Sequence, residues 1–138
     1  MDREQEWDKR LQICTTGRDD VNADEYRYPY EPTPYSVLER LADSGLIRSE
    51  NVVLDYGCGK GRVEFFLSGQ TNAAAIGIEY DERIYRLAME NRKTAATKPK
   101  SDFVLTSAEE YAVPAKVNRC FFFNPFSPEI LQKVMARI

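Results

Sequence analysis

The stretch of this chain that most constrains its fold is residues 52–62, with the sequence VVLDYGCGKGR. An apolar, β-branched run ends at the carboxylate of Asp55, and glycines follow at positions 57, 59 and 61. This order is typical of a buried strand that turns tightly into a helix. Glycine permits positive φ and a close approach of a ligand, and the amide N–H groups at a helix start favour an anionic group. The sequence therefore predicts a nucleotide-like ligand on this loop.

The spacing of the glycines separates the possible ligands. A dinucleotide site needs Gly-x-Gly-x-x-Gly, and the last of those positions holds the bulky Arg62. The pattern Asp-x-Gly-x-Gly-x-Gly instead resembles the first motif of class I S-adenosylmethionine-dependent methyltransferases. The resemblance implies that the loop wraps the methionine part of the cofactor, S-adenosyl-L-methionine, with the strand-end acid near its amino group. The implied cofactor contacts here are Asp55, Gly57, Cys58, Gly59 and Gly61; the alternative is a glycine-rich turn in an ordinary α/β protein.

Size and composition limit the classes of protein that fit. A chain of 138 residues with 43% hydrophobic content suits one globular domain, and a formal net charge of -3 gives no general argument for nucleic-acid binding. The three cysteines form no Cys-x-x-Cys pair, the start is not secretory and no run has membrane-spanning length, so we expect a cytoplasmic protein. Without histidine, a His-ligated metal site or a His-based triad is excluded, and we expect no metal.

The first part of the chain is expected to be an extension. Residues 1–24 form this extension, in which Trp7, Leu11 and Cys14 have helical spacing before a polar loop, and residues 25–138 form the cofactor-binding domain. The tyrosine- and proline-rich segment 25–35 opens that domain. It is either a strap docked on the core or a lid or wall beside the cofactor.

A helix is expected to follow this segment. Thr33 can cap it and Pro34 can take its first position, with Val37, Leu38 and Leu41 facing inward and the helix stopping at Gly45. The Thr-Pro pair also resembles an element of the amino-group methyltransferases that act on DNA, where it touches the methionine end of the cofactor. That resemblance implies a cofactor contact at Thr33.

A second strand, residues 73–79, is predicted after a helix that begins at the glycine loop and ends at Gly69 with Val63, Phe65, Phe66 and Leu67 buried. The strand closes with Glu79, about 20 residues past the glycines, the distance at which an α/β unit places a carboxylate against a ribose. Glu79 is therefore the predicted ribose ligand, with Tyr80 beside it. The alternative is a cap for the next helix, for which Asp81 is better suited; the inward stripe of that helix is Ile84, Leu87 and Ala88.

A third strand, residues 102–106, is followed by the tripeptide that the resemblance places at the adenine edge. The family carries there an acidic residue or a serine before alanine, so the implied contacts are Ser107, Ala108 and Glu109, with the choice among them open. A fourth strand, residues 117–123, is expected to be buried on both faces.

The tripeptide Asn124-Pro125-Phe126 comes at the end of the fourth strand, where ligands bind in open parallel sheets. It resembles the Asn/Asp-Pro-Pro-aromatic motif of methyltransferases that modify amino nitrogens, shortened by one proline. The resemblance implies that Asn124 accepts a hydrogen bond from the target amine, beside the cofactor, and that Phe126 packs on it. The tripeptide can equally be a turn before a helix in which Ser127 caps and Pro128 takes the first position. The apolar stripe of that helix is Ile130, Leu131, Val134, Met135 and Ile138.

These elements predict an α/β, Rossmann-like, doubly wound and mostly parallel sheet with local strand order 3-2-1-4. The resemblance implies three further strands, so we expect either a fragment or a sheet edge covered by another protein or a second copy, as in a homodimer. The predicted function is S-adenosylmethionine-dependent methyl transfer, to a nitrogen of a small molecule or protein rather than a nucleic acid. The motifs look most like those of a group of small bacterial methyltransferases. The alternative function is a non-catalytic cofactor-binding or interaction module.

Overall fold

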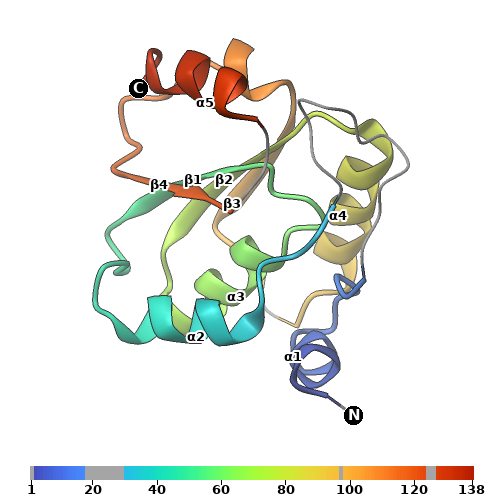
Figure 1. Ribbon diagram of the computed structural model, residues 1–138. Coiled ribbons are helices and arrows are strands. Elements are labelled where there is room, and N and C mark those ends of the chain that lie inside the picture. Colours follow the sequence, from blue (N-terminus) through green and yellow to red (C-terminus); the bar gives the residue numbers. More distant parts are fainter. Residues whose placement is uncertain (1, 18–29, 97, 124–126) are drawn as a thin grey trace.

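The sheet is the centre of the molecule. The computed structural model describes residues 2–17, 30–96, 98–123 and 127–138. Within them, parallel strands form one sheet in the order β3-β2-β1-β4 (Figure 1), as the sequence predicted. The strands are β1 (Val52–Tyr56), β2 (Ala74–Glu79), β3 (Ser101–Leu105) and β4 (Arg119–Phe122). The order reverses between β1 and β4, and in open parallel sheets ligands bind at the carboxyl ends of the strands at such a reversal.

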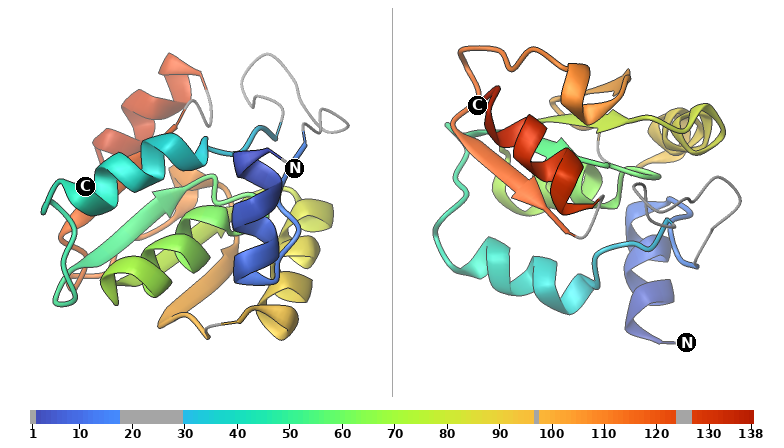
Figure 2. Two further views of the ribbon diagram at one scale, coloured as in Figure 1. Left: turned by 90° about the horizontal axis from the view of Figure 1, so that it is seen from below. Right: turned by 45° about the horizontal axis from the view of Figure 1, so that its top comes forward.

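Helices cover both faces of the sheet, as Figure 2 shows. They are α1 (Arg3–Leu11), α2 (Tyr35–Asp43), α3 (Arg62–Thr71), α4 (Glu82–Thr94) and α5 (Pro128–Met135), with a 3-10 turn η1 (Ala108–Glu110). One core lies under α2, α3 and α4 and includes Val53 of β1; the other lies under α5 and includes Leu54. The alternation along β1 thus sends neighbouring side chains into opposite layers.

The helix after the glycine loop is buried almost throughout its first two turns, including the predicted Val63, Phe65, Phe66 and Leu67. It does not end at Gly69. It continues to Thr71 and stops at Asn72, which adopts the left-handed conformation with φ 60°. Gly69 sits inside the helix because no turn is needed there, whereas asparagine tolerates the left-handed conformation that ends it.

The cap predicted at the start of α2 was wrong. Pro34 occupies the N-cap position, and the Thr33 side chain makes no capping hydrogen bond. Val37 is also 40% exposed, because α2 docks on the core through Leu38 and the partly buried Leu41. The helix ends before Gly45, as predicted.

Three other sequence expectations about helices are corrected. Helix α1 ends at Leu11, where Gln12 is left-handed, so Cys14 lies beyond the helix and is exposed. Leu87 of α4 is 37% exposed, whereas Ile84 and Ala88 are buried. In α5, Ile130 and Val134 are buried, but the exposed members of the expected stripe are Leu131, Met135 and Ile138. A short helix at the rim of a sheet buries only the positions directly above the strands.

Strand β4 is not buried on both faces. It is the outer strand of the sheet next to β1, and it is shorter than expected. Arg119 and Cys120 are exposed, and Phe121 and Phe122 are half-buried. The apolar run predicted burial, but an apolar sequence does not reveal which strand occupies the edge of the sheet.

Candidate functional site

The glycine loop between β1 and α3 has the backbone that its sequence predicts. Gly57, Gly59 and Gly61 have φ of 74°, 57° and 92°. The Gly57 and Cys58 amides both donate to the Ile78 carbonyl, at 2.9 and 2.8 Å, and so hold the loop over the end of β2. The loop is therefore fixed at the carboxyl edge of the sheet, where ligands bind in open parallel sheets.

Glu79, at the end of β2, is bound to this loop. One carboxylate oxygen accepts a hydrogen bond from the Gly59 amide at 3.0 Å, and the other accepts from the Asp81 amide at 3.0 Å. Asp81 itself caps α4 by accepting from the amides of Arg83 and Ile84. The capping role weighed for Glu79 therefore belongs to Asp81, and Glu79 is left beside the glycine loop. Burial raises the pKa of the Glu79 carboxyl to about 7.

Two glycines are required by close packing. A Cβ on Gly61 would lie 2.7 Å from the Phe65 ring and 3.1 Å from the Phe103 ring, so this glycine lets α3 pack against β3. Gly77, in β2, is a residue that the sequence analysis missed. A Cβ there would lie 2.7 Å from Cβ of Cys58, so glycine at this position makes room for the Cys58 side chain under the loop.

A pair of buried carboxyls lies beneath the loop. Asp55, at the end of β1, is 2% exposed and Glu64, in the first turn of α3, is fully buried. Among the described residues, Asp55 Oδ2 and both Glu64 oxygens are buried without a hydrogen bond of regular geometry. Burial raises the pKa of Asp55 to about 6, and burial together with the neighbouring Asp55 raises the pKa of Glu64 well above its usual range. Two adjacent buried carboxyls cannot both ionise cheaply, so Glu64 is the protonated partner.

The thiol of Cys58 is also held in the neutral form. Its side chain is buried, and burial together with Glu64, Glu79 and Asp55 raises its pKa well above the usual range. The neutral thiol donates a hydrogen bond to the Gly59 carbonyl, with a sulfur–oxygen distance of 3.7 Å.

Arg62, which the sequence analysis treated only as an obstacle to a dinucleotide, is the centre of a buried network. Its guanidinium forms an ion pair with Glu4 and donates to Thr15 Oγ1 at 2.7 Å and to the Thr33 carbonyl at 3.1 Å. It lies 4.1 Å from the centre of the Tyr35 ring. The network ties residues 2–17 to the start of α3, where Figure 2 shows α1 lying across the helix end. No sequence pattern predicts these partners of Arg62, because they come from three separate segments of the chain.

The other predicted cofactor residues lie near the same edge. The amide of Thr106 donates to the Glu79 carbonyl at 3.0 Å, which brings the end of β3 next to the end of β2. Ser107, Ala108 and Glu109 follow directly, are half-buried and begin η1. Tyr80 is half-buried after Glu79, and Thr33 is buried beside Arg62.

The predicted catalytic residues Asn124, Pro125 and Phe126 lie outside the described residues. Ser127 and Pro128, which follow them, begin α5 as predicted, with Ser127 Oγ accepting a hydrogen bond from the Ile130 amide at 3.4 Å. The turn-and-helix interpretation is thus confirmed for residues 127–128. That interpretation does not compete with a role for Asn124 at the end of β4.

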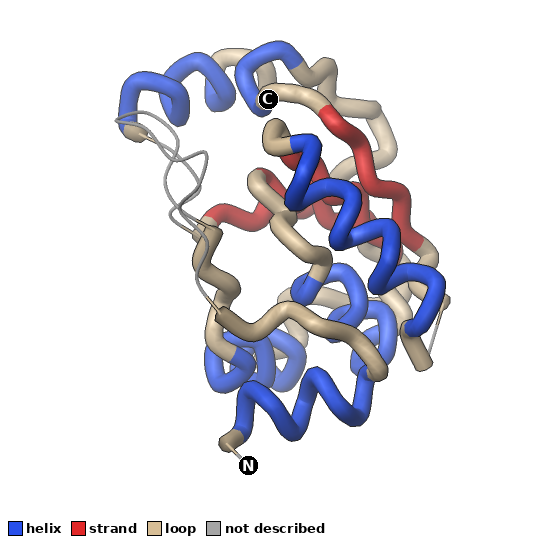
Figure 3. Tube along the Cα trace, turned by 90° about the vertical axis from the view of Figure 1, so that its right-hand side faces the viewer, coloured by secondary structure: helices blue, strands red, loops and turns tan. Residues whose placement is uncertain are grey.

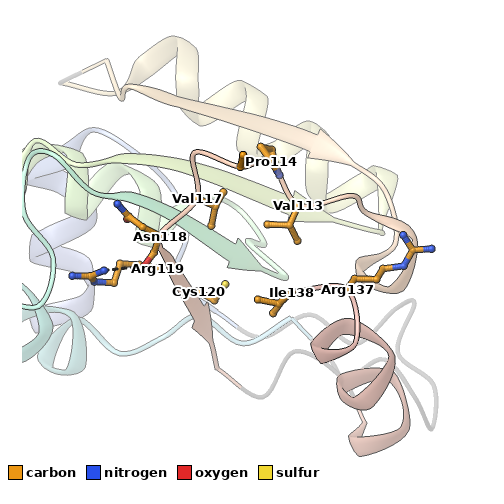
Figure 4. A pocket seen from close by; sticks show the side chains of 9 residues that line it. Val113, Pro114, Val117, Asn118, Arg119, Cys120, Arg137 and Ile138 are labelled. Carbon is orange, nitrogen blue, oxygen red and sulfur yellow. Dashed lines mark hydrogen bonds between the residues drawn. The ribbon is translucent and has the colours of Figure 1, made fainter.

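A cavity of about 360 Å³ opens at the other end of β4 (Figure 4). It lies between residues 113–120 and the last residues of the chain, and its polar side chains include Asn118, Arg119 and Arg137. Because Arg119 is the first residue of β4, this cavity is at the amino end of the strand, opposite the carboxyl edge where ligands bind in such sheets. It is separate from the glycine loop.

Two general classes of site or segment are not found. Among the described residues, no group of three or more His, Cys, Asp or Glu side chains could hold a metal ion. The described helices also include none that is both long and apolar enough to cross a membrane.

Comparisons with known proteins agree with this geometry. No protein-family model matches the chain. A protein-lysine N-methyltransferase of Saccharolobus islandicus (strain REY15A) is 33% identical over 64 residues, which are 46% of this chain and 40% of that protein. The chain thus spans about two fifths of the length of this curated relative.

Solved structures that superpose on this chain include methyltransferases. An RNA methyltransferase from Salinibacter ruber, in complex with S-adenosyl-L-homocysteine, superposes with a TM-score of 0.59 at 24% identity, covering 65% of this chain and 58% of that one. An rRNA methylase from Streptococcus thermophilus superposes with a TM-score of 0.59 at 16% identity, covering 79% and 64%. Together with the strand order and the glycine loop, these matches show that the chain has the Rossmann-like fold of the class I S-adenosylmethionine-dependent methyltransferases.

Proposed function

We propose that this protein binds S-adenosylmethionine on the glycine loop and transfers its methyl group to a nitrogen atom of an acceptor. The observation that carries the proposal is the hydrogen bond of 3.0 Å between the Gly59 amide and the Glu79 carboxylate. It joins the loop that suits the amino-acid end of the cofactor to the carboxylate that suits its sugar. Structural neighbours with bound S-adenosyl-L-homocysteine and S-adenosylmethionine support this choice of cofactor.

The residues of the loop region fit such a ligand. Each Glu79 oxygen accepts one backbone hydrogen bond and retains acceptor capacity for a ribose hydroxyl. Asp55 is the buried acid closest in the chain to the loop, and its negative charge favours an ammonium group above it. Ser107, Ala108 and Glu109 are proposed to meet the adenine. The cofactor itself supplies the electrophilic methyl group.

The acceptor site is proposed at Asn124, Pro125 and Phe126, which begin one residue after the end of β4. A neutral amide oxygen orients an amine without holding it as a cation, and an aromatic face tolerates the positive charge of a methylated amine. Transfer then depends on positioning, because the sulfonium loses its charge as the methyl leaves. The similar protein-lysine N-methyltransferase makes a lysine side chain the first acceptor to test.

Binding and turnover test the two halves of this function separately. Calorimetry with S-adenosyl-L-homocysteine should show a saturable site, and incubation with S-adenosylmethionine and a lysine peptide should release S-adenosylhomocysteine. The matched peptide carries methionine in place of lysine and should not be methylated. Absence of any binding would contradict the whole proposal. Binding without turnover on lysine, free amines or oxygen acceptors would instead favour a non-catalytic binding module.

The role of Asn124 is tested by one substitution and one control. Asn124→Ala should leave the affinity for S-adenosyl-L-homocysteine within about twofold and lower turnover by roughly 100-fold, as expected for a group that acts on the acceptor. The control is Asn118→Ala, at the opposite end of β4. Equal loss of affinity and turnover in Asn124→Ala would mean that the residue is structural.

We also propose self-association through the outer edge of β4. Cys120 on that strand is exposed, Phe123 directly after the strand is exposed, and α5 exposes Leu131 and Met135. An open sheet edge with apolar neighbours pairs readily with a second copy. Analytical ultracentrifugation should show a concentration-dependent dimer, and a monomer at every concentration would contradict the proposal.

A cytoplasmic location is proposed on the three free thiols, Cys14, Cys58 and Cys120.

A further inference from the structure

A closed set of contacts, the Tyr30–Thr15–Arg62 network, begins and ends at the glycine loop. The Tyr30 ring lies against Gly59, since a Cβ built on this glycine would be 2.6 Å from Cδ1 of the ring and still closer to Cε1. The Lys60 ammonium lies 4.8 Å from the centre of the same ring. The Tyr30 hydroxyl donates to the Thr15 carbonyl at 2.6 Å, and Thr15 Oγ1 accepts from Arg62 Nε at 2.7 Å. Because Arg62 is the first residue of α3, the Tyr30–Thr15–Arg62 network returns to the end of the loop.

Helix α1 supplies the carboxylates that pair with Arg62 in this network. The Arg62 residue is only 2% exposed, and its guanidinium is paired with Glu4 and lies 3.9 Å from Asp8 Oδ1. Asp8 also accepts from the Thr15 amide at 2.7 Å, its hydroxyl at 2.6 Å and the Tyr35 hydroxyl at 2.6 Å. These hydrogen bonds lower the pKa of Asp8 despite its burial. The loop that follows α1, which crosses the molecule in Figure 3, is thus held by an ionised carboxylate and a buried cation.

The two contacts on Gly59 come from different directions. Tyr30 approaches the glycine on the side where a side chain would stand. Glu79 binds its amide N–H at 3.0 Å. The Cβ and N–H directions of one residue diverge, so the ring and the carboxylate together restrict rotation of the peptide planes around Gly59. Without Tyr30, this part of the loop would keep the Glu79 carboxylate, the strand-end hydrogen bonds and the hydrogen bond of 3.0 Å from Asn91 Nδ2 to the Lys60 carbonyl.

We infer that Tyr30, Thr15 and Arg62 are positioning residues that hold the glycine loop in its ligand-binding shape, and that residues 2–17 are therefore part of the cofactor site. The inference rests on the proposed function for the identity of the ligand. A loop that is ordered before the ligand arrives loses less conformational entropy on binding, which increases affinity. By linkage, a ligand that fixes the loop also stabilises the docking of residues 2–17.

The sharpest test removes one atom of the Tyr30–Thr15–Arg62 network, the hydroxyl oxygen of Tyr30. Tyr30→Phe keeps the aromatic ring on Gly59 and deletes the hydroxyl that binds the Thr15 carbonyl. The expected result is about fivefold weaker binding of S-adenosyl-L-homocysteine, the scale of one lost hydrogen bond. The matched control is Tyr85→Phe. Tyr85 lies on α4, outside the Tyr30–Thr15–Arg62 network, and its hydroxyl donates to the Phe103 carbonyl at 3.4 Å. The control should change the affinity by less than about twofold.

Hydrogen exchange measures the same inference without a ligand. In ligand-free Tyr30→Phe, amides of residues 13–16 and 57–62 should exchange several-fold faster than in the wild type, whereas amides of β3 should be unchanged. Unchanged exchange and unchanged affinity in Tyr30→Phe would overturn the inference. Tighter binding by Tyr30→Ala would also overturn it, because the ring would then occupy the space of the ligand. If the wild type binds no S-adenosyl-L-homocysteine, the proposed function fails. Faster exchange in the variant would still show that the Tyr30–Thr15–Arg62 network orders the loop.

Discussion

The Glu79 carboxylate accepts a hydrogen bond from the Gly59 amide across 3.0 Å, although the two residues are 20 positions apart in the chain. One lies at the end of β2 and the other in the loop after β1. The contact brings the two halves of the proposed cofactor site into one unit before any ligand is present. The two backbone amides offset part of the cost of burying this carboxylate, but burial prevails and raises its pKa to about 7.

Replacing Glu79 should therefore weaken the cofactor more than it weakens the fold. Glu79→Ala removes the proposed ribose acceptor and the anchor of the Gly59 amide, and should cost about 1–3 kcal/mol of binding free energy for S-adenosyl-L-homocysteine. The control is Glu82→Ala, since Glu82 is exposed and pairs only with Arg86 among the ion pairs described here. Calorimetry in which both variants match the wild type would remove Glu79 from the site.

Gly59 should not tolerate a side chain. Gly59→Ala places a Cβ within the Tyr30 ring and strains a backbone with φ 57°, so we expect a loss of about 2–4 kcal/mol in unfolding free energy. Gly45→Ala is the matched control, because Gly45 has φ 79° with no atom within 4 Å of the new Cβ. It should cost only the backbone strain, about 1 kcal/mol. Urea unfolding of both variants gives the comparison, and equal losses would show that the Tyr30 contact is not tight.

Sequence reasoning reached most of the fold because the signals for it are local. The glycines with positive φ and the acids near the ends of the first two strands follow from patterns within about 30 residues. The strand order was predicted from the alternation of strands and helices and from right-handed crossovers. The partners of Arg62 could not be predicted, because Glu4, Thr15 and Thr33 converge only in the folded chain. The exposure of β4 was missed because an apolar run has the same sequence at the edge and at the centre of a sheet.

The buried carboxyls should make the protein less stable as pH rises. Folding raises the pKa of Asp55 from 3.8 to about 6 and of Glu79 from 4.5 to about 7, and raises that of Glu64 as well. A raised pKa favours the folded state below the unfolded pKa, and that contribution is lost as pH rises through the folded pKa. Asp8 acts in the opposite sense, because its lowered pKa favours folding above about pH 4. We expect Tm to be highest near pH 5 and to fall by about 3–6 °C towards pH 8.

Glu64→Gln tests the cause of this pH dependence. The glutamine amide can donate a hydrogen bond to Asp55, which stays buried, but it cannot ionise when the chain unfolds, so the contribution of Glu64 to the pH dependence is removed. The fall in Tm between pH 5 and pH 8 should then be clearly smaller than in the wild type. Glu90→Gln, which alters an exposed carboxylate paired with Lys93, is the control and should follow the wild-type curve. A Glu64→Gln curve parallel to the wild type would mean that the pair does not share a proton.

The buried cation should matter far more to stability than an exposed one. Arg62→Met removes a guanidinium whose side chain is 3% exposed and leaves Glu4 and Asp8 facing one another across a core position. Breaking a buried pair typically costs about 3–5 kcal/mol, and we expect a loss in that range. The control, Arg86→Met, removes a cation that is 74% exposed and pairs with Glu82, and should change stability by less than about 0.5 kcal/mol.

Combining Arg62→Met with Asp8→Asn tests whether the cost comes from an unpaired charge. The double variant also removes the charge of Asp8, the more buried of the two carboxylates that Arg62→Met leaves without their cation, so it should be more stable than the sum of the two single losses predicts. Urea unfolding of the single and double variants gives this coupling energy. Additive losses would mean that Arg62 contributes through the packing of its side chain on Tyr35 rather than through its charge.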